Sequence, residues 1–378
     1  MTEESSARRF WGRKTRELIP YVPGEQPRER TFIKLNTNEN PYSPASAVDQ
    51  ALRSYPPERI RLYPDPASTQ LRNVLAEYYG WPASGIFVGN GSDEVLALAF
   101  QAFFNSRADL GRAGAALQDF LPGECLVFPD ITYSFYPVYA RMYEIPFRTV
   151  PLREDFSLPI EDLLQPSAGL ILANPNAPTG IAVGTDVLAA LAAADPDRLL
   201  IIDEAYVDFG AESAVSLLDR FDNLLIVQTC SKSRSLAGLR VGCALGAPAL
   251  IEGLERVRDS FNSYTVDSLA QVAAAAAFSD AGWYERTRAR IIATRERTAA
   301  ALRTLGFQIL PSSANFLFVS CPRRPARQLY QELRREGILV RHFNLPRIDN
   351  YLRITIGKDE DMDQLTETLR QLLPPDET

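Results

Sequence analysis

Residues 224–242 read Leu-Leu-Ile-Val-Gln-Thr-Cys-Ser-Lys-Ser-Arg-Ser-Leu-Ala-Gly-Leu-Arg-Val-Gly, an apolar run followed by a polar turn that contains one lysine. The run is apolar without alternation, which is typical of a strand in a parallel sheet covered by helices on both faces. Similar runs alternate with helical patterns along the chain, and this rhythm predicts an α/β fold. We expect strands at 86–88, 125–128, 147–150, 169–173, 199–202, 224–227 and 241–245.

The remaining sequence predicts a division into three parts. Residues 1–45 contain several prolines and little periodicity, so we expect an arm that packs on the small domain, on a partner subunit or on both. Residues 46–280 carry the seven apolar runs and form the predicted large domain. A long arginine-rich helical pattern at 283–305 then opens a smaller α+β C-terminal domain, 281–378. Glycines and prolines within 105–124 predict a surface insertion.

Composition limits the classes of function. The 378 residues include 40 Lys+Arg and 47 Asp+Glu, with 46% hydrophobic and 23% charged residues, which excludes a disordered chain. The net charge of −7 and the lack of a long basic run argue against nucleic-acid binding, so we expect small-molecule ligands. No stretch reaches the roughly 18 apolar residues of a membrane span, and no apolar leader occurs at the N-terminus. The expected location is the cytoplasm, without membrane contact.

Histidine and cysteine usage narrows the chemistry. His342 is the only histidine, so a Ser-His-Asp triad elsewhere in the chain and a multi-histidine zinc site are excluded. No metal is expected. The four cysteines lie far apart without a C-x-x-C pair, which predicts buried thiols in a reducing compartment.

The turn after the 224–227 run places Lys232 at the carboxyl end of a strand. In α/β sheets this edge forms the ligand crevice, where an amine can be desolvated and become nucleophilic. The hydroxyls of Thr229 and Ser231 and the guanidinium of Arg240 would surround a phosphate. The alternative is an ordinary exposed lysine in a serine-rich turn.

A second strand end carries an acid. Leu199-Leu-Ile-Ile-Asp203-Glu-Ala-Tyr206 puts Asp203 after four apolar residues. A carboxylate there stays ionised only beside a cation, because an unpaired buried charge is very costly, and a protonated pyridine nitrogen is such a cation. An N-cap or a metal ligand is the structural alternative, but neither explains Tyr206.

Two further strand ends carry turns. Gly89-Asn-Gly91-Ser92-Asp-Glu precedes a helical pattern, so free N–H groups, with Ser92 as the helix cap, predict an anion site. Asn174-Pro-Asn-Ala-Pro-Thr-Gly180 would fix a polar ligand edge, or is simply a proline-rich turn. Together the four strand ends supply an amine, an acid, a phosphate cradle and a rigid turn, the set needed for pyridoxal 5′-phosphate.

In this order, G-N-G-S-D-E, N-P-N-A-P-T-G, D-E-A-Y and S-K with an arginine eight residues later, the chain resembles the fold-type I, aspartate-aminotransferase-like enzymes that use this cofactor. The segments Lys34-Leu-Asn-Thr-Asn-Glu-Asn-Pro-Tyr42, Arg61-Leu-Tyr-Pro-Asp65 and Asn350-Tyr-Leu-Arg-Ile-Thr-Ile-Gly357 are similar to the histidinol-phosphate aminotransferase family. The resemblance runs from about residue 18 to 373. It implies a three-layer α/β/α large domain with a mostly parallel seven-stranded sheet, and a smaller α+β C-terminal domain.

The resemblance also implies roles. Lys232 would anchor the cofactor covalently and then transfer a proton, Asp203 would keep the pyridine nitrogen protonated, and Tyr206 would hydrogen-bond the ring hydroxyl. Tyr133 would stack on the ring, unless it is a core aromatic. The cofactor-binding set implied is Gly91, Ser92, Asp93, Tyr133, Asn176, Asp203, Tyr206, Thr229, Ser231, Lys232, Arg240 and, from the neighbouring subunit of a homodimer with shared sites, Tyr63.

For the substrate, the resemblance implies that Arg353 binds the anionic end, with Arg341, Tyr21 and Asn40 nearby. Guanidinium geometry suits both a phosphate and a carboxylate, so one site would take histidinol phosphate and glutamate or 2-oxoglutarate in alternate half-reactions. The product from histidinol phosphate would be imidazole acetol phosphate, a step of histidine biosynthesis.

Two positions depart from the family pattern. The family often has an asparagine directly before Pro-Thr-Gly that contacts the ring hydroxyl, whereas this chain has Ala177 there; we assign that contact to Asn176, one place earlier. Phe261-Asn262-Ser-Tyr lacks the proline often found after that asparagine.

The alternatives with the same cofactor are an aromatic or other amino-acid aminotransferase and a decarboxylase of a phosphorylated amino acid. A regulatory module is disfavoured because no DNA-binding extension precedes residue 18, and a nucleotide-binding enzyme because no glycine-rich nucleotide motif follows a strand.

Overall fold

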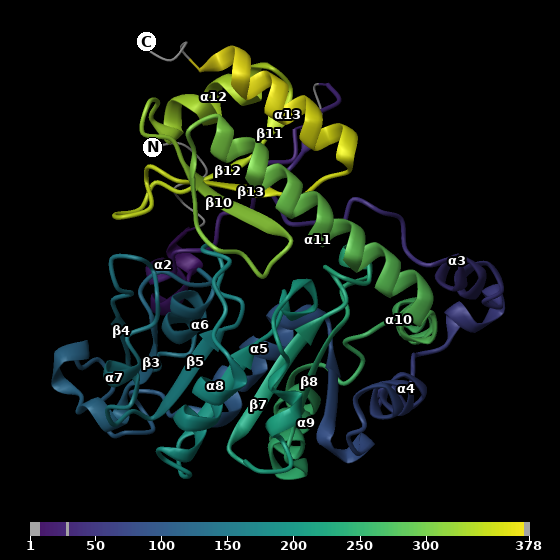
Figure 1. Ribbon diagram of the computed structural model, residues 1–378. Helices are drawn as coiled ribbons and strands as arrows, with labels where there is room; N and C mark the ends of the chain where they lie inside the picture. The colour runs from purple at the N-terminus through teal and green to yellow at the C-terminus, as the bar shows by residue number, and fades with distance from the viewer. Residues whose placement is uncertain (1–7, 28–29, 374–378) are drawn as a thin grey trace.

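The computed structural model describes residues 8–27 and 30–373, and its largest element is a seven-stranded sheet (Figure 1). The strand order is β2-β8-β7-β6-β5-β3-β4. Each strand overlaps a predicted apolar run, so the α/β prediction is confirmed. The strands are β2 (Ile86–Gly89), β3 (Leu126–Pro129), β4 (Phe147–Val150), β5 (Gly169–Ala173), β6 (Leu199–Asp203), β7 (Leu224–Thr229) and β8 (Gly242–Gly246).

The sheet is mostly parallel, as expected, and β8 is the exception. It runs antiparallel to both of its neighbours, β2 and β7, whereas the other strand pairs are parallel. The reason lies in residues 230–241, which connect β7 to β8 through a tight turn and the short 3-10 helix η8 (Ala237–Leu239) in place of a crossover helix. This turn keeps Lys232 at the end of the sheet.

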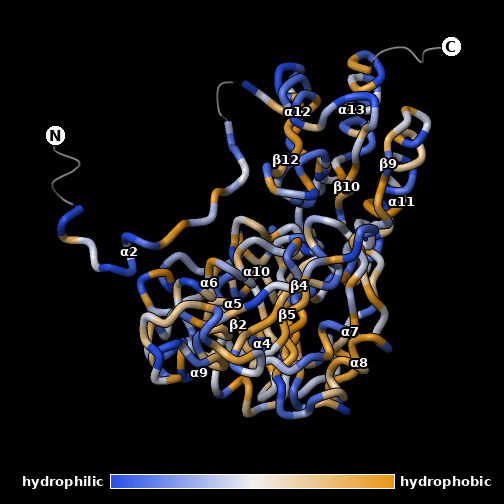
Figure 2. The backbone as a smooth tube through the Cα atoms, turned by 90° about the vertical axis from the view of Figure 1, so that its left-hand side faces the viewer, coloured by the Kyte–Doolittle hydropathy of each residue, from blue (hydrophilic) through white to orange (hydrophobic). Residues whose placement is uncertain are grey.

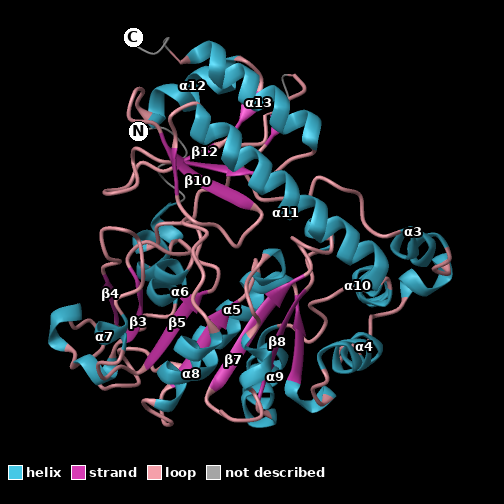
Figure 3. Ribbon diagram, viewed as in Figure 1, coloured by secondary structure: helices cyan, strands magenta, loops and turns pink. Residues whose placement is uncertain are grey.

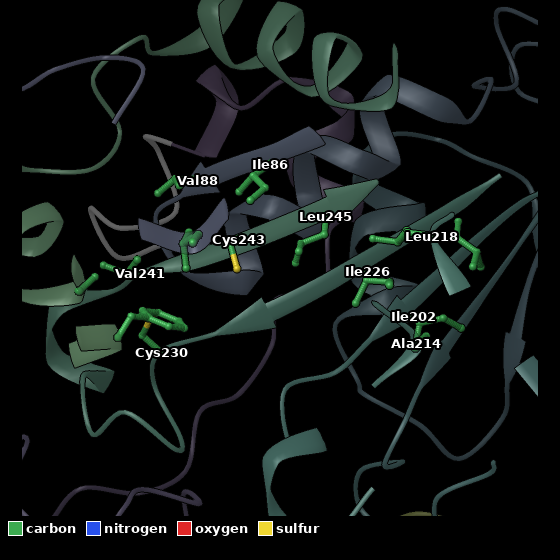
Figure 4. Close-up of a cluster of buried hydrophobic side chains, with 14 of the residues drawn as sticks. Ile86, Val88, Ile202, Ala214, Leu218, Ile226, Cys230, Val241, Cys243 and Leu245 are labelled. Atoms are coloured by element: carbon green, nitrogen blue, oxygen red, sulfur yellow. The ribbon is translucent and has the colours of Figure 1, made fainter. Parts of the chain in front are cut away.

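Helices cover both faces of the sheet, which explains why its strands are apolar throughout (Figure 3). Successive residues of β6 alternate between two cores: Leu200 and Ile202 belong to one, Ile201 to the other. Figure 4 shows part of the first core, where Ile202, Ile226 and Leu245 lie along neighbouring strands. That core also contains residues of α3 (Ser46–Arg53), α4 (Thr69–Tyr79), α7 (Ile160–Leu163), α8 (Thr185–Ala193) and α10 (Ser268–Ser279). The opposite core contains residues of α5 (Gly91–Phe103), α6 (Tyr136–Met142) and α9 (Pro248–Phe261).

A second, smaller α+β unit lies beyond the sheet's carboxyl edge (Figure 1). Its four-stranded antiparallel sheet has the order β12-β13-β10-β9 and packs with three helices around a core of its own. Its elements are α11 (Ala281–Thr304), β9 (Gln308–Ile309), β10 (Phe316–Ser320), α12 (Ala326–Arg335), β11 (Ile338–Leu339), β12 (Arg341–His342), β13 (Leu352–Thr355) and α13 (Asp359–Leu372).

The N-terminal arm connects to this second unit. Its strand β1 (Ile33–Lys34) pairs in parallel with β11, while α2 (Arg13–Glu17) lies beside the main body in Figure 2. The arm exposes large apolar side chains, among them Phe10, Ile19 and Val22. Residues 1–7, 28–29 and 374–378, which the predicted arm and C-terminal domain include, lie outside the described part. The domain limits at 46 and 281 stay predictions.

Three general expectations can be compared with the described residues. The four cysteines are buried free thiols, as predicted. Residues 105–124 form turns and two short 3-10 helices, η4 (Leu117–Asp119) and η5 (Pro122–Glu124), in a largely exposed segment. Within 8–27 and 30–373, no helix is long and apolar enough to cross a membrane, and no group of three His, Cys, Asp or Glu is placed to hold a metal ion.

Candidate active site

The carboxyl ends of the parallel strands place their polar side chains around one cavity of about 360 Å³. In the strand register, Asp203 at the end of β6 lies between Ala173 and Val227, and Thr229 lies opposite Gly242 of β8. The cavity also receives residues from the arm and from the small sheet, so segments near both ends of the chain meet there. The predicted site residues that line it are Tyr21, Ser92, Asp93, Tyr133, Asp203, Tyr206, Thr229, Ser231, Lys232, Arg240, Arg341 and Arg353.

Lys232 presents its amine to this cavity. Its Nζ donates to the Thr37 carbonyl oxygen at 3.2 Å and lies 5.8 Å from the centre of the Tyr206 ring. The turn around it is fixed by Asn40, whose Nδ2 donates to the carbonyl oxygens of Lys232 and Ser233 at 3.0 and 3.3 Å. A lysine with a fixed backbone and an amine in a partly closed cavity suits covalent binding of a carbonyl group.

Asp203 is the buried acid of the site, with 3% of its surface exposed. Its Oδ2 accepts a hydrogen bond from the Tyr136 hydroxyl at 2.9 Å, and its Oδ1 accepts one from the Ala205 backbone N–H at 3.1 Å. Burial raises the pKa of the Asp203 carboxyl to about 6, against these two hydrogen bonds, which lower it. Sequence reasoning missed this partner, because Tyr136 is one of three aromatic residues close together at 133–136 and no local pattern pairs it with Asp203.

Tyr206 projects from the loop after β6, and its hydroxyl meets the arm. Asn38 Nδ2 donates to the Tyr206 Oη at 2.9 Å, while Asn38 Oδ1 accepts from the Thr355 hydroxyl at 2.9 Å. Because the amide donates to Tyr206, the phenolic proton is free to donate toward the cavity. Asn38 lies in a motif that sequence analysis quoted, but nothing in the sequence pairs it with Tyr206.

Close backbone approach builds the anion cradle. Helix α5 begins at Gly91 with Asn90 as its N-cap. The prediction that Ser92 is the cap is therefore wrong; Ser92 is a residue of the first turn, and it lines the cavity. Gly91 has a φ of +80°, and a Cβ there would collide with the Arg240 guanidinium. A Cβ at Gly242 would collide with the Ser92 backbone nitrogen. Both positions therefore require glycine.

The polar groups of the cradle are held by Asp93. Its carboxylate accepts from Arg240 Nη2 at 2.9 Å and from the Tyr133 hydroxyl at 2.7 Å. Arg240 Nη1 also lies 3.5 Å from the Ser231 hydroxyl, which accepts from Thr229 Oγ1 at 3.0 Å. Because a carboxylate repels a phosphate, the Asp93 side chain positions the arginine and the tyrosine, and its backbone N–H is the group suited to an anion.

Two arginines occupy the opposite wall. Arg341 and Arg353 are register partners on the neighbouring strands β12 and β13. Arg353 Nη2 donates to the Asn36 carbonyl oxygen at 3.1 Å, its Cζ lies 5.4 and 5.5 Å from the rings of Phe316 and Phe343, and its buried Nε has no partner in the described part of the chain. Burial lowers the pKa of Arg353. Its unsatisfied donor is what an anionic ligand would satisfy.

Asn176 is not among the residues that line the cavity, so the structure does not support its predicted cofactor contact. The Asn176 Nδ2 donates to the Ile131 carbonyl oxygen at 3.0 Å, and its Oδ1 accepts from the Thr132 hydroxyl at 2.9 Å. Its amide therefore holds the turn together. The neighbouring Ala177 lines the cavity instead and offers no polar group.

Two other predicted side chains, those of Asn40 and Tyr63, lie outside the cavity. Asn40 holds the lysine turn, as described above, and its Oδ1 accepts from the Tyr42 backbone N–H at 3.0 Å, so the structure does not support its predicted substrate contact. Tyr63 is 81% exposed and stacks on Tyr264 at 4.6 Å between ring centres. Its predicted contact is to the site of another subunit, so its place in this chain leaves that prediction untested.

The residues present fit pyridoxal 5′-phosphate. A cradle of hydroxyls, a first helical turn and the Arg240 guanidinium suits the phosphate dianion. Asp203 is a buried carboxylate, and none of the described protein groups within hydrogen-bonding distance of it is a cation. A pyridinium would be the cationic partner that such a carboxylate needs. Lys232 lies in the same cavity and supplies the amine.

Comparison with known proteins agrees with this geometry. Residues 30–369 match the family described as aminotransferase class I and II. Histidinol-phosphate aminotransferase 1 of Bradyrhizobium diazoefficiens is 52% identical, over 97% of this chain and 99% of that protein. Histidinol-phosphate aminotransferase of Chromohalobacter salexigens is 51% identical, over 96% of this chain and 98% of that protein.

A solved structure extends the likeness to the fold. The histidinol-phosphate aminotransferase of Sinorhizobium meliloti, crystallised in complex with pyridoxal-5′-phosphate, superposes with a TM-score of 0.81 at 24% identity, covering 96% of this chain and 98% of that one. The two chains therefore share the same fold.

Proposed function

Because the chain belongs to the class I and II aminotransferases, and within them to the histidinol-phosphate aminotransferase family, we propose that it transfers an amino group between histidinol phosphate and 2-oxoglutarate with pyridoxal 5′-phosphate as cofactor. The products would be imidazole acetol phosphate and glutamate. The reaction belongs to histidine biosynthesis, and the proposed location is the cytoplasm.

Pyridoxal 5′-phosphate supplies an aldehyde that condenses with amines and a ring that accepts the electron pair left when the substrate Cα loses a proton. Lys232 would provide the anchoring amine and the base that moves the proton at the substrate Cα. Asp203 holds the proton on the ring nitrogen, and Tyr206 donates to the ring oxygen. Thr229, Ser231 and Arg240 hold the phosphate.

The pair Arg353 and Arg341 is the observation that favours a phosphorylated substrate. A carboxylate needs one bidentate guanidinium, whereas a phosphate dianion gains from two. Arg353 carries a buried donor without a partner in the described part of the chain, and Arg341 is its register partner on the adjacent strand. Among the described residues, Arg341 donates only to carbonyl oxygens of the arm, at 3.1 Å to Val22 and 3.4 Å to Pro23, so no carboxylate neutralises its charge there.

A homodimer with shared sites is part of the proposal. Tyr63 and Tyr264 are stacked on each other, and Leu62 and Phe261 beside them in the sequence are also exposed, by 53% and 80%. Exposed apolar side chains in such a group are typical of an interaction surface. In the proposed dimer, Tyr63 reaches the phosphate cradle of the neighbouring subunit.

One observation favours a second candidate, an aromatic amino-acid aminotransferase. A cavity of about 790 Å³ adjoins the site and shares Tyr21, Tyr133, Ala177, Arg341 and Arg353 with it. Much of its remaining lining is apolar, including Val138, Phe343 and Ile348. An aromatic side chain would fit there as well as an imidazole would.

Steady-state rates on a panel of amino donors test the proposal. With 2-oxoglutarate as acceptor and glutamate as the measured product, we expect kcat/KM for histidinol phosphate to exceed that for phenylalanine or tyrosine by at least about 100-fold, because only the phosphate satisfies both arginines. Efficient turnover of phenylalanine or tyrosine without turnover of histidinol phosphate would establish the second candidate.

A further inference from the structure

Tyr136 is the first residue of α6, and its side chain is completely buried. Its ring packs edge-on against Tyr133 and Phe128, with 5.7 and 5.9 Å between ring centres. This packing fixes the hydroxyl 2.9 Å from Asp203 Oδ2. Because an ionised carboxylate only accepts hydrogen bonds, the phenol is the donor.

We propose that Tyr136 is a positioning residue, which orients the Asp203 carboxylate and keeps it negatively charged so that it can hold the proton on the cofactor's pyridine nitrogen. This inference rests on the proposed function, because the pyridine nitrogen is present only when pyridoxal 5′-phosphate is bound. It adds to the reaction a residue that does not itself touch the cofactor.

The hydrogen bonds of Asp203 carry the orientation argument. One carboxylate oxygen accepts from Tyr136 and the other from the Ala205 backbone N–H. Rotation of the carboxylate would break both bonds, so its plane is fixed. Each oxygen accepts one bond and keeps a lone pair for the ring nitrogen.

The surroundings of Asp203 carry the charge argument. It lines the cavity, where the charge of Lys232 favours the ionised form of Asp203 and the charge of Asp93 on α5 opposes it, while burial is the largest effect and favours the neutral acid. Tyr136 is the first of the groups that counteract burial. Without it the carboxyl would take the proton from the ring nitrogen: the N–H bond breaks, an O–H bond forms, and both partners become neutral.

The expected effect on catalysis follows from the strength of a hydrogen bond to a charged group. Loss of this bond should lower kcat by about 10- to 100-fold, because the uncharged ring is a weaker electron acceptor in the transition state. KM should stay within about threefold, because Tyr136 is not among the residues that line the substrate cavity.

Nitrogen-15 NMR of the holoenzyme tests the proposal. Wild type, Tyr136→Phe and the control Tyr139→Phe are loaded with cofactor labelled at the ring nitrogen. Tyr139 lies one turn later on α6 in the same core, and it makes no side-chain hydrogen bond to Asp203 in the described part of the chain. We expect the resonance of a protonated ring nitrogen in wild type and in Tyr139→Phe, and a shift toward the unprotonated position, together with the fall in kcat, in Tyr136→Phe.

An unchanged ring-nitrogen resonance in Tyr136→Phe would overturn the inference. If that variant does not retain the cofactor, urea unfolding of the apoproteins at pH 8 decides. Tyr136→Phe should lower the free energy of unfolding more when it is introduced into the wild type than when it is introduced into Asp203→Asn. Equal losses in the two backgrounds would overturn the inference. Failure of the proposed function would give a different result. The wild type would then not turn over histidinol phosphate, while the ring-nitrogen resonance would still differ between the wild type and Tyr136→Phe.

Discussion

Replacing Asp203 with asparagine should make the cofactor-free protein more stable at neutral pH while it destroys activity. The side chain is 3% exposed, and in the apoprotein its negative charge has no cation within hydrogen-bonding distance in the described part of the chain. Asparagine has the same shape and can accept from Tyr136 without carrying a charge. The substitution therefore removes a charge that only the bound cofactor would compensate.

The magnitude and sign follow from the pKa of Asp203, which burial raises from 3.8 to about 6. Between these two pH values the folded protein holds a proton that the unfolded chain has released, so stability falls as the pH rises through this window. At about 1.4 kcal/mol per pH unit, the carboxylate costs roughly 3 kcal/mol above pH 6. Asp203→Asn should equal the wild type near pH 4 and exceed its free energy of unfolding by about 2–3 kcal/mol at pH 8.

Urea unfolding of the apoproteins at pH 4, 6 and 8 measures this difference. Asp109→Asn is the control, because the pKa of that exposed carboxyl is lowered by hydrogen bonds from Ser106, so its replacement should give no gain at pH 8. Adding pyridoxal 5′-phosphate should stabilise the wild type more than Asp203→Asn, because only the carboxylate pairs with the pyridinium. An advantage of Asp203→Asn that does not change between pH 4 and 8 would refute the reasoning.

Three further predictions concern the remaining groups. Borohydride reduction of the holoenzyme followed by peptide mapping should label Lys232, and Lys232→Ala should lose the visible absorbance of the lysine-bound cofactor; label on another lysine would contradict the assignment. Arg353→Ala should lower kcat/KM for both histidinol phosphate and glutamate by about 30-fold or more, since a buried anion loses its partner. Arg341→Ala should lower kcat/KM for histidinol phosphate more than for glutamate, and an equal loss for the two substrates in this variant would argue against the two-arginine site. Mixing Tyr63→Phe with Lys232→Ala subunits should restore activity above either parent, because one site of the mixed dimer then carries neither change; a monomer by light scattering at micromolar concentration would exclude shared sites.

The sheet could be predicted from the sequence because its strands are buried on both faces. Short runs such as 199–202 and 224–227 contain no polar residue, so their assignment as buried strands is unambiguous. The polar residue after each run marks the carboxyl end of the strand. Since parallel strands end at the same edge, Asp203 and Lys232 were expected in one cavity and are found there. The apolar pattern alone could predict the site residues attached to strand ends, whereas Tyr21, Arg341 and Arg353, which also line the cavity, were implied only by the family resemblance.

The residues that sequence reasoning missed depend on contacts between distant segments. Asn38 reaches Tyr206 because β1 pairs with β11 and brings the arm under the small sheet, a long-range pairing that no local pattern encodes. The unsupported contact of Asn176 has a different origin. Asn176 and Ala177 are neighbours in a turn between two prolines, but Asn176 bonds within the turn whereas Ala177 lines the cavity. Assigning the family's asparagine contact to the position one residue earlier therefore placed it on a side chain that does not line the cavity.

Taken together, the charges of the site are arranged for ligands and not for the empty protein. Asp203 is a buried anion without its cation, and Arg353 is a cation whose buried Nε has no acceptor in the described part of the chain. Each arrangement lowers the stability of the ligand-free fold, and each is relieved by one part of the reaction, the pyridinium for the acid and the substrate anion for the arginine. The binding energy of the ligands is therefore concentrated on Asp203 and Arg353, which fix the cofactor ring and the substrate relative to Lys232. For this reason, substitutions at these two residues that stabilise the empty protein should weaken catalysis.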